Sequence, residues 1–235
     1  MFANRVEAGR LLAQELITFC NDDQAILLAL PRGGVVVAYQ LSLALHLPLD
    51  VLVTRKIGAP GNPEFALGAI CETGAIYWNR EATSDLPLST QQRHSAVRAQ
   101  EQEIARRVGL YRQGRPFPDL TGRTIIVVDD GLATGATFFA SVAAIRQKRP
   151  RRILGAVPVA PRAAVQEARN LLDQLIVLDV PDPFYSVGNF YSDFTQVDDQ
   201  EVLQCLRSAR EALLAVQPGP TPPPGEAPAV QHDAN

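Results

Sequence analysis

The segment IIVVDDGLATGAT, residues 125–137, constrains the fold of this chain more than any other part of it. Ile125–Val128 is an apolar, β-branched run, which is typical of a parallel strand buried on both faces. Asp129 and Asp130 follow at the carboxyl end of that strand, where open α/β sheets bind ligands. Thr134–Thr137 then opens a helical pattern and offers backbone N–H groups to an anion such as phosphate. A structural strand and turn with two capping aspartates is the alternative, but the whole segment favours a site for a phosphorylated sugar.

Strand and helix patterns alternate along the rest of the chain, which predicts a parallel sheet with helical crossovers. Apolar runs predict parallel strands at residues 25–30, 49–54, 123–129, 152–159 and 175–180. Helical periodicity predicts an N-terminal helix capped by Asn4, a long charged helix near 90–111, and crossover helices at 35–45, 134–147 and 162–172. Shorter apolar runs at 67–71 and 75–78 fit a β-hairpin.

Size and composition favour one α/β domain over residues 1–216 of the 235 in the chain. The net charge of −3 argues against bulk attraction to nucleic acid or to a membrane surface. Three widely spaced cysteines, a charged N-terminal helix and the absence of an apolar run of about 20 residues predict a cytoplasmic protein without disulfides. The proline-rich composition of residues 217–235 predicts a disordered tail.

Two further segments place cations at the same edge of the predicted sheet. The first strand ends in LPRGG, residues 30–34, where Arg32 offers a charged fork and the glycines permit close approach to an anion. The second strand ends in TRKIGAPGNPEFALGAI, residues 54–70, where Arg55 and Lys56 precede a loop rich in Gly and Pro. We expect a mobile lid there, because such a loop makes few buried contacts. The structural alternatives are a simple strand-to-helix turn and a solvated hairpin.

These three segments together resemble the type I phosphoribosyltransferases. Residues 125–137 are similar to the family's motif for 5-phosphoribosyl-1-pyrophosphate (PRPP), which is a hydrophobic run, two acids, a short turn and Thr-Gly-x-Thr. LPRGG resembles the family's pyrophosphate loop, in which the peptide corresponding to Arg32–Gly33 is often strained. Residues 54–70 resemble the flexible loop of adenine-type and orotate-type members. The resemblance implies a Rossmann-like parallel sheet flanked by helices, with a small hood from parts of 1–20, 56–112 and 181–200.

The resemblance implies a Mg²⁺-dependent transfer of the 5-phosphoribosyl group from PRPP to a nucleobase-like small molecule, or the reverse reaction. The transfer would pass through an oxocarbenium-like sugar. Asp129, Asp130 and Lys56 would be catalytic, and the two aspartates would also bind the metal. The substrate-binding residues would be Arg32, Gly33, Arg55, Ala133, Thr134, Gly135, Ala136, Thr137 and Phe184. Members of the family commonly dimerise, which leaves a homodimer open.

Two features of the sequence bear on the identity of the acceptor base. Ala133 stands where members acting on 6-oxopurines usually carry an aspartate for proton transfer, which argues against hypoxanthine or guanine. Adenine-type and orotate-type members also carry alanine there. Residues 181–194 resemble the base-contacting segment of 6-oxopurine enzymes, and Phe184 matches the aromatic residue that stacks on the base. The five aromatic residues of this segment more often indicate packing in a core or an interface.

A non-catalytic protein of the same fold that senses PRPP or a nucleotide is the alternative function. Retention of Arg32 and Lys56 favours catalysis, because a sensor of the 5-phosphate alone would not need cations for the pyrophosphate. A P-loop NTPase would require a Gly-Lys-Ser/Thr signature, and a Rossmann dehydrogenase would require GxGxxG after the first strand. The sequence carries neither motif.

Overall fold

The computed structural model describes residues 1–86 and 88–216, so the tail predicted at 217–235 lies outside the described residues. A parallel five-stranded sheet forms the centre of the molecule, in the strand order β2-β1-β6-β7-β8. The predicted Rossmann-like α/β class is therefore confirmed. The strands of this sheet are β1 (Ala25–Ala29), β2 (Leu49–Val51), β6 (Thr124–Val128), β7 (Arg152–Val159) and β8 (Gln174–Asp179).

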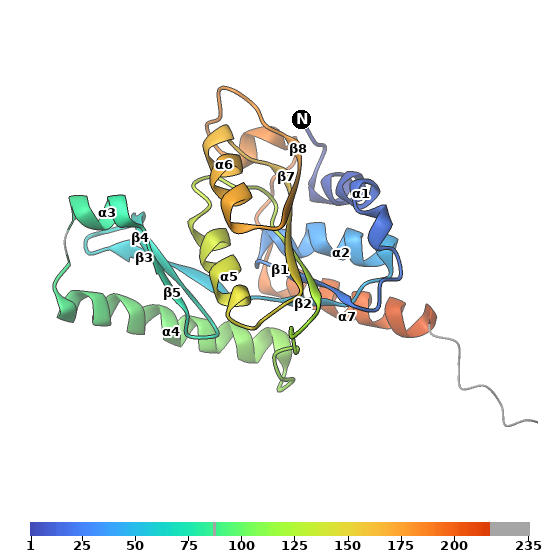
Figure 1. Cartoon of the computed structure of the whole chain (residues 1–235), viewed down its shortest axis with the longest axis horizontal. Helices are drawn as coiled ribbons and strands as arrows, with labels where there is room; N and C mark the ends of the chain where they lie inside the picture. The colour runs from blue at the N-terminus through green and yellow to red at the C-terminus, as the bar shows by residue number, and fades with distance from the viewer. Residues whose placement is uncertain (87, 217–235) are drawn as a thin grey trace, which may run out of the picture.

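Helices cover both faces of the central sheet (Figure 1). One face carries α1 (Arg5–Glu15), α2 (Gly33–Leu45) and α7 (Asp199–Val216), and the other carries α5 (Ala136–Arg146) and α6 (Arg162–Leu171). Two short 3₁₀ helices are η1 (Ile17–Phe19) and η2 (Val187–Phe190). None of the helices in the described ranges is long and apolar enough to cross a bilayer.

The two helical layers explain why the central strands are apolar throughout. Successive side chains of a strand point to opposite faces of the sheet. Leu27 packs into the core under α1 and α2, whereas its neighbour Leu28 packs into the core under α5 and α6. All residues of β1 and β6 are buried, as the unbroken apolar run at 125–128 predicted.

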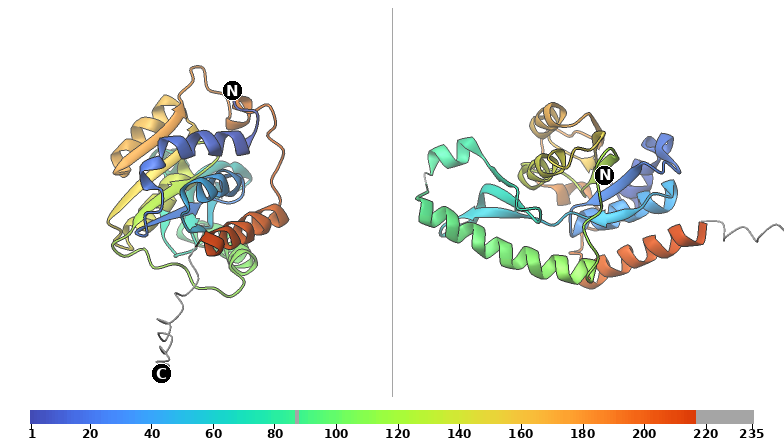
Figure 2. Two further views of the ribbon diagram at one scale, coloured as in Figure 1. Left: turned by 90° about the vertical axis from the view of Figure 1, so that its right-hand side faces the viewer. Right: turned by 60° about the horizontal axis from the view of Figure 1, so that its bottom comes forward.

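A second, antiparallel sheet lies to one side of the central sheet (Figures 1 and 2). Helix α3 (Arg80–Asp85) and the long helix α4 (Thr90–Arg112) accompany it, and we call residues 54–112 the hood. The predicted hairpin and the predicted long helix are both present, and Ser89 and Gln92 form a capping box at the start of α4. The strands of the hood are β3 (Thr54–Ala59), β4 (Asn62–Cys71) and β5 (Ile76–Trp78).

The hood corrects two sequence-based expectations. The run at 49–54 is not one strand, because β2 pairs with β1 while β3 pairs antiparallel with β4. Residues 54–70 are consequently a paired β-hairpin over most of their length, rather than the expected loop. The physical reason is burial: Ile57 and Leu67 are completely buried, which gives the hairpin apolar contacts that a solvated loop would lack.

A buried arginine joins the hood to the central sheet. Arg112, at the end of α4, is 2% exposed and donates to Val51 O at the end of β2. Its guanidinium also pairs with Glu72, at 3.0 Å from Oε1, and with Asp50, at 3.3 Å from Oδ1. These contacts tie α4, the β4–β5 turn and β2 together through one side chain.

We expect Arg112→Ala to lower the free energy of unfolding by about 3–5 kcal/mol, because Glu72 and Asp50 would keep their charges without a buried partner. Urea denaturation followed by circular dichroism measures the loss. Arg146→Ala is the matched control, since Arg146 pairs with Asp173 at the surface and the two side chains are 44% and 45% exposed. We expect that change to cost less than about 1 kcal/mol. Equal losses in the two variants would contradict the role given to Arg112.

Candidate active site

The LPRGG turn and the end of β6 pack against each other at the carboxyl edge of the central sheet, because β1 and β6 are parallel neighbours. A Cβ atom on Gly34 would lie 2.8 Å from Val128 O, and one on Gly33 would lie 1.8 Å from Asp130 Oδ2. Such approaches are too close for any residue with a side chain. Glycine at both positions therefore lets the turn contact the two aspartates that follow β6.

A cavity of about 540 Å³ opens beside these aspartates. The turn residues 133–137 form much of its wall together with Asp129. Helix α5 begins at Ala136, slightly later than predicted, because Gly135 has a φ of +74° and caps the helix. A Cβ atom on Gly135 would lie 2.4 Å from the ring of Phe139, so this turn requires glycine. The residues predicted to bind the 5-phosphate thus line one cavity at a helix N-terminus.

The hood supplies the opposite wall and separates two cations that the sequence placed together. Lys56 lines the cavity, whereas Arg55 donates from Nε to Gln100 Oε1 of α4 at 3.2 Å. The separation follows from the alternation of side chains along β3. Further cavity residues from the hood and η2 are Phe65, Asn79, Ala82 and Val187.

The side chains of the adjacent residues Asp129 and Asp130 also have different surroundings. Asp129 faces the cavity, and its Oδ1 accepts a 2.9 Å hydrogen bond from the backbone N–H of Asp130. The Asp130 carboxylate instead accepts from Arg5 Nε at 2.7 Å, and its backbone carbonyl accepts from the Tyr191 hydroxyl at 2.6 Å. Arg5 additionally donates to Thr195 O at 2.9 Å. Asp129 is therefore presented to a ligand, and Asp130 is held by the protein.

Electrostatics at the two aspartates differ accordingly. Burial raises the pKa of Asp129 well above its usual value, and the neighbouring charge of Asp130 raises it further. Burial also raises the pKa of Asp130, but the ion pair with Arg5 opposes that change. A ligand that brings hydroxyl donors or positive charge to Asp129 would relieve this unfavourable environment.

Arg5 and Tyr191 are site residues that the sequence analysis missed. Arg5 lies on the same face of α1 as the buried residues Ala8 and Leu12, and its side chain is only 10% exposed. A charged residue within the buried stripe of an amphipathic helix was the available signal. Tyr191 carried no local signal, since its partner is a backbone carbonyl distant in sequence.

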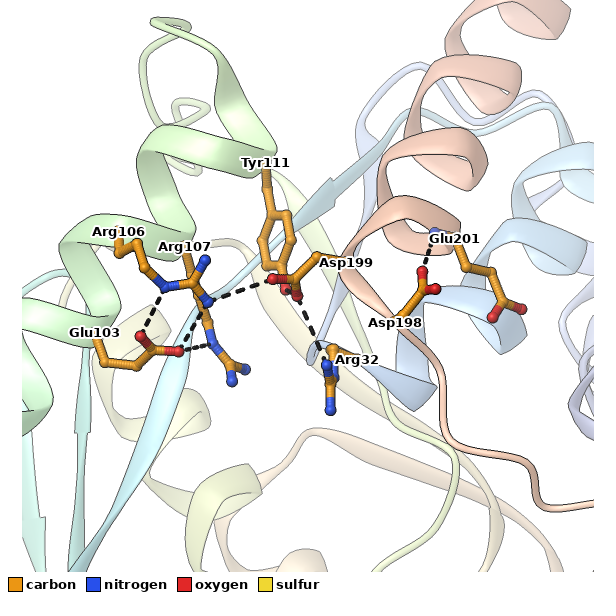
Figure 3. Close-up of polar contacts among 8 residues, drawn as sticks. All are labelled: Arg32, Glu103, Arg106, Arg107, Tyr111, Asp198, Asp199 and Glu201. Carbon is orange, nitrogen blue, oxygen red and sulfur yellow. Dashed lines mark hydrogen bonds and ion pairs between the residues drawn. The ribbon is translucent and has the colours of Figure 1, made fainter.

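Arg32 lies at the other end of the site, next to α7 (Figure 3). Its Nη1 is 3.9 Å from Oδ1 of Asp199, the first residue of α7. The cis peptide of this turn joins Pro31 and Arg32, one residue before the bond that the resemblance indicated. Neither α7 nor a role for Asp199 was predicted, because the sequence analysis assigned no helix to the end of the domain at 199–216.

The structure places Phe184 in a packed aromatic cluster. Its ring stacks on Phe190 with centroids 5.2 Å apart, and both lie against the buried residues Phe2 and Tyr191. Val187, from the same segment, is the residue that lines the cavity. This arrangement supports the packing interpretation that the sequence left open for the aromatic residues of 181–194.

The donor set fits a magnesium ion that arrives with its substrate. Among residues 1–86 and 88–216, no three His, Cys, Asp or Glu side chains come together as a metal cluster. Mg²⁺ usually binds through one or two carboxylates plus substrate phosphates, and it keeps several waters. Asp129, which faces the cavity, is the carboxylate suited to that arrangement, with Asp130 directly behind it.

We expect Arg5→Met to lower the free energy of unfolding by about 3 kcal/mol or more, because it leaves the Asp130 carboxylate buried without its cation. Adding Asp130→Asn to Arg5→Met should recover much of that loss, since the unpaired charge is removed. Chemical denaturation of the two single variants and the double variant forms the cycle. Additive losses across this cycle would show that the pair at 2.7 Å is not coupled.

Comparison with known proteins identifies the family. The family model of the phosphoribosyl transferase domain matches residues 3–184. Two Mycobacterium tuberculosis proteins, of strains CDC 1551 and H37Rv, bear the name "putative phosphoribosyl transferase" and are 39% identical over 209 residues, 89% of this chain and 47% of each relative. The chain thus spans about half the length of these curated relatives. The crystal structure of TT1426 from Thermus thermophilus is 39% identical, with a TM-score of 0.74 over 88% of this chain and 98% of that one. The chain belongs to the phosphoribosyl transferase family.

Proposed function

We propose that this protein is a Mg²⁺-dependent phosphoribosyltransferase that transfers the 5-phosphoribosyl group of PRPP to a nitrogenous base, or runs the reverse reaction. The observation that carries the proposal is a single cavity lined by the 133–137 turn, Asp129 and Lys56. This cavity combines an anion site, a carboxylate and a cation at the carboxyl edge of the sheet, where α/β proteins bind ligands.

The 5-phosphate would bind at the N-terminus of α5. Backbone N–H groups of residues 134–137 have no partner within the helix there, and the helix dipole favours an anion. The hydroxyls of Thr134 and Thr137, which line the same cavity, would add donors. This anchor would fix the sugar in a productive position before reaction.

Asp129 would act on the ribose. Loss of pyrophosphate from the anomeric carbon leaves positive charge on the sugar, and a nearby carboxylate stabilises it electrostatically. The same carboxylate would accept hydrogen bonds from the ribose hydroxyls. Magnesium, held by Asp129 together with substrate oxygens, would supply positive charge beside the pyrophosphate, with Asp130 behind Asp129 rather than on the metal.

The leaving pyrophosphate would lie between Lys56 and the LPRGG turn. Lys56 and Arg32 would neutralise the charge that develops on it. The acceptor would meet a largely apolar wall built from Phe65, Ala82 and Val187. With alanine at position 133, that wall suits a neutral planar base that needs no carboxylate there for proton transfer.

A protein of this fold that binds PRPP or a nucleotide without turnover is the second candidate function. The cations at the pyrophosphate end favour transfer, because a sensor of the 5-phosphate alone gains nothing from them. We place the reaction in the cytoplasm, consistent with three cysteines that form no disulfide. We also propose a homodimer, which members of the family commonly form.

Titration calorimetry with PRPP, with and without Mg²⁺, tests the proposed substrate. We expect binding that tightens when Mg²⁺ is present, because the metal offsets the repulsion between PRPP and Asp129. Absence of heat under both conditions would remove PRPP as the ligand. Incubating nucleoside monophosphates with pyrophosphate, and assaying PRPP formation, then identifies the base.

We expect Asp129→Asn to lower turnover by about 100-fold or more, because it removes negative charge next to the developing cation. Binding of ribose 5-phosphate should persist, since the 133–137 turn is unchanged. Asp23→Asn is the control, because Asp23 is exposed and lies before β1, at the opposite edge of the sheet. Unchanged turnover in Asp129→Asn would show that the carboxylate has no part in the reaction.

A further inference from the structure

Four arginines from three separate elements gather beside the LPRGG turn. Arg32 belongs to that turn, Arg55 to β3, and Arg106 and Arg107 to α4. Figure 3 shows Arg32, Arg106 and Arg107 around two carboxylates, Glu103 of α4 and Asp199 of α7. The hood thus brings cations, and α7 a carboxylate, to the Arg32 end of the candidate site, beyond the cavity at residues 133–137.

The two carboxylates orient the α4 arginines. Glu103 accepts from Arg106 Nε at 2.8 Å and from Arg107 Nε at 2.7 Å. Asp199 accepts from Arg106 Nη2 at 3.3 Å and from the Tyr111 hydroxyl at 2.6 Å. These bonds fix Arg106 between two acids and hold the guanidinium of Arg107 by its inner nitrogen.

The cluster carries more positive than negative charge. Four guanidinium groups face two carboxylates, and Arg32 reaches the nearer one only at 3.9 Å. Burial lowers the pKa of Arg55, and the charges of Arg107, Arg106 and Arg32 lower it further, against the opposing effect of Glu103. Like charges repel, so a further anion among these arginines would be stabilised by them.

Arg107 is the member best placed to meet that anion. Its side chain is 14% exposed, and among the described residues its terminal nitrogens make no hydrogen bond. Figure 3 shows the ends of the Arg107 and Arg32 side chains on the same side of Glu103 and Asp199. Two forked donors on one side of the acids suit a group with several anionic oxygens.

We propose that Arg107, oriented by Glu103, binds the diphosphate group of the substrate together with Arg32 and Arg55, so that helix α4 supplies a fixed cation to the leaving group. The proposal rests on the proposed function and adds a residue to it. Arg106 is a positioning residue here, because its guanidinium group already pairs with Glu103 and with Asp199. Asp199 joins α7 to the same site.

Calorimetry with Mg²⁺-pyrophosphate and with ribose 5-phosphate separates the two ends of the site. In Arg107→Gln we expect the dissociation constant for pyrophosphate to rise by about tenfold or more, the effect of losing one charge-assisted hydrogen bond. Binding of ribose 5-phosphate should not change. Arg107→Lys should recover part of the loss, because it restores the charge but not the fork. Arg98→Gln, an exposed arginine of the same helix, should match the parent protein.

The outcomes distinguish this inference from the proposed function. If the parent protein binds PRPP and Arg107→Gln and Arg107→Lys both bind pyrophosphate normally, Arg107 has no role in the site while the proposed function stands. Equal weakening of pyrophosphate and ribose 5-phosphate would indicate a general structural defect and would also overturn the inference. If the parent protein binds neither PRPP nor pyrophosphate, the proposed function fails, and the inference fails with it.

Discussion

The ion pair between Arg5 and Asp130 is the contact on which the site depends. It joins α1 to the end of β6 at 2.7 Å, and Gly33 of the LPRGG turn leaves the space that the Asp130 carboxylate fills. Helix α1, the LPRGG turn and the end of β6 are distant in sequence, and all three therefore meet at the Asp130 carboxylate. Because Arg5 supplies the counter-ion for the buried Asp130 carboxylate, the packing of α1 stabilises the turn after β6. Asp129, the adjacent residue, then faces the cavity.

The hood is tied to the site at both ends of its structure. Thr54, at the start of β3, lies with its hydroxyl 2.8 Å from that of Ser141 in α5, and Ser141 donates to Thr137 O at the start of the same helix, in the turn proposed to bind phosphate. At the other end, Arg112 anchors α4 to β2. Lys56 follows two residues after Thr54, so its position over the cavity is set by the same contact that steadies the turn.

The sequence predicts the parts of this structure whose cause is local. The apolar run at 125–128 and the glycines at 33, 34 and 135 determine a buried strand and tight turns from their own chemistry. The break between β2 and β3 has no such signal, because residues 49–54 form one run and the partner strand β4 lies beyond a further turn. Arg5, Tyr191 and Asp199 act through distant partners, which a single sequence does not reveal.

Pairing of residues 54–70 into a hairpin bears on how the proposed pyrophosphate end of the site would work. A loop that orders over the substrate loses conformational entropy at each binding event, whereas a cation on a paired strand or a long helix has already lost it during folding. Arg55 on β3 and the arginines of α4 are held in this second way, by Gln100 and Glu103. Such preorganised charge causes repulsion in the free protein, which the anionic end of the proposed substrate would offset on binding. The hood would therefore avoid a loss of conformational entropy when the substrate binds. Repulsion among its arginines would in exchange lower the stability of the free protein.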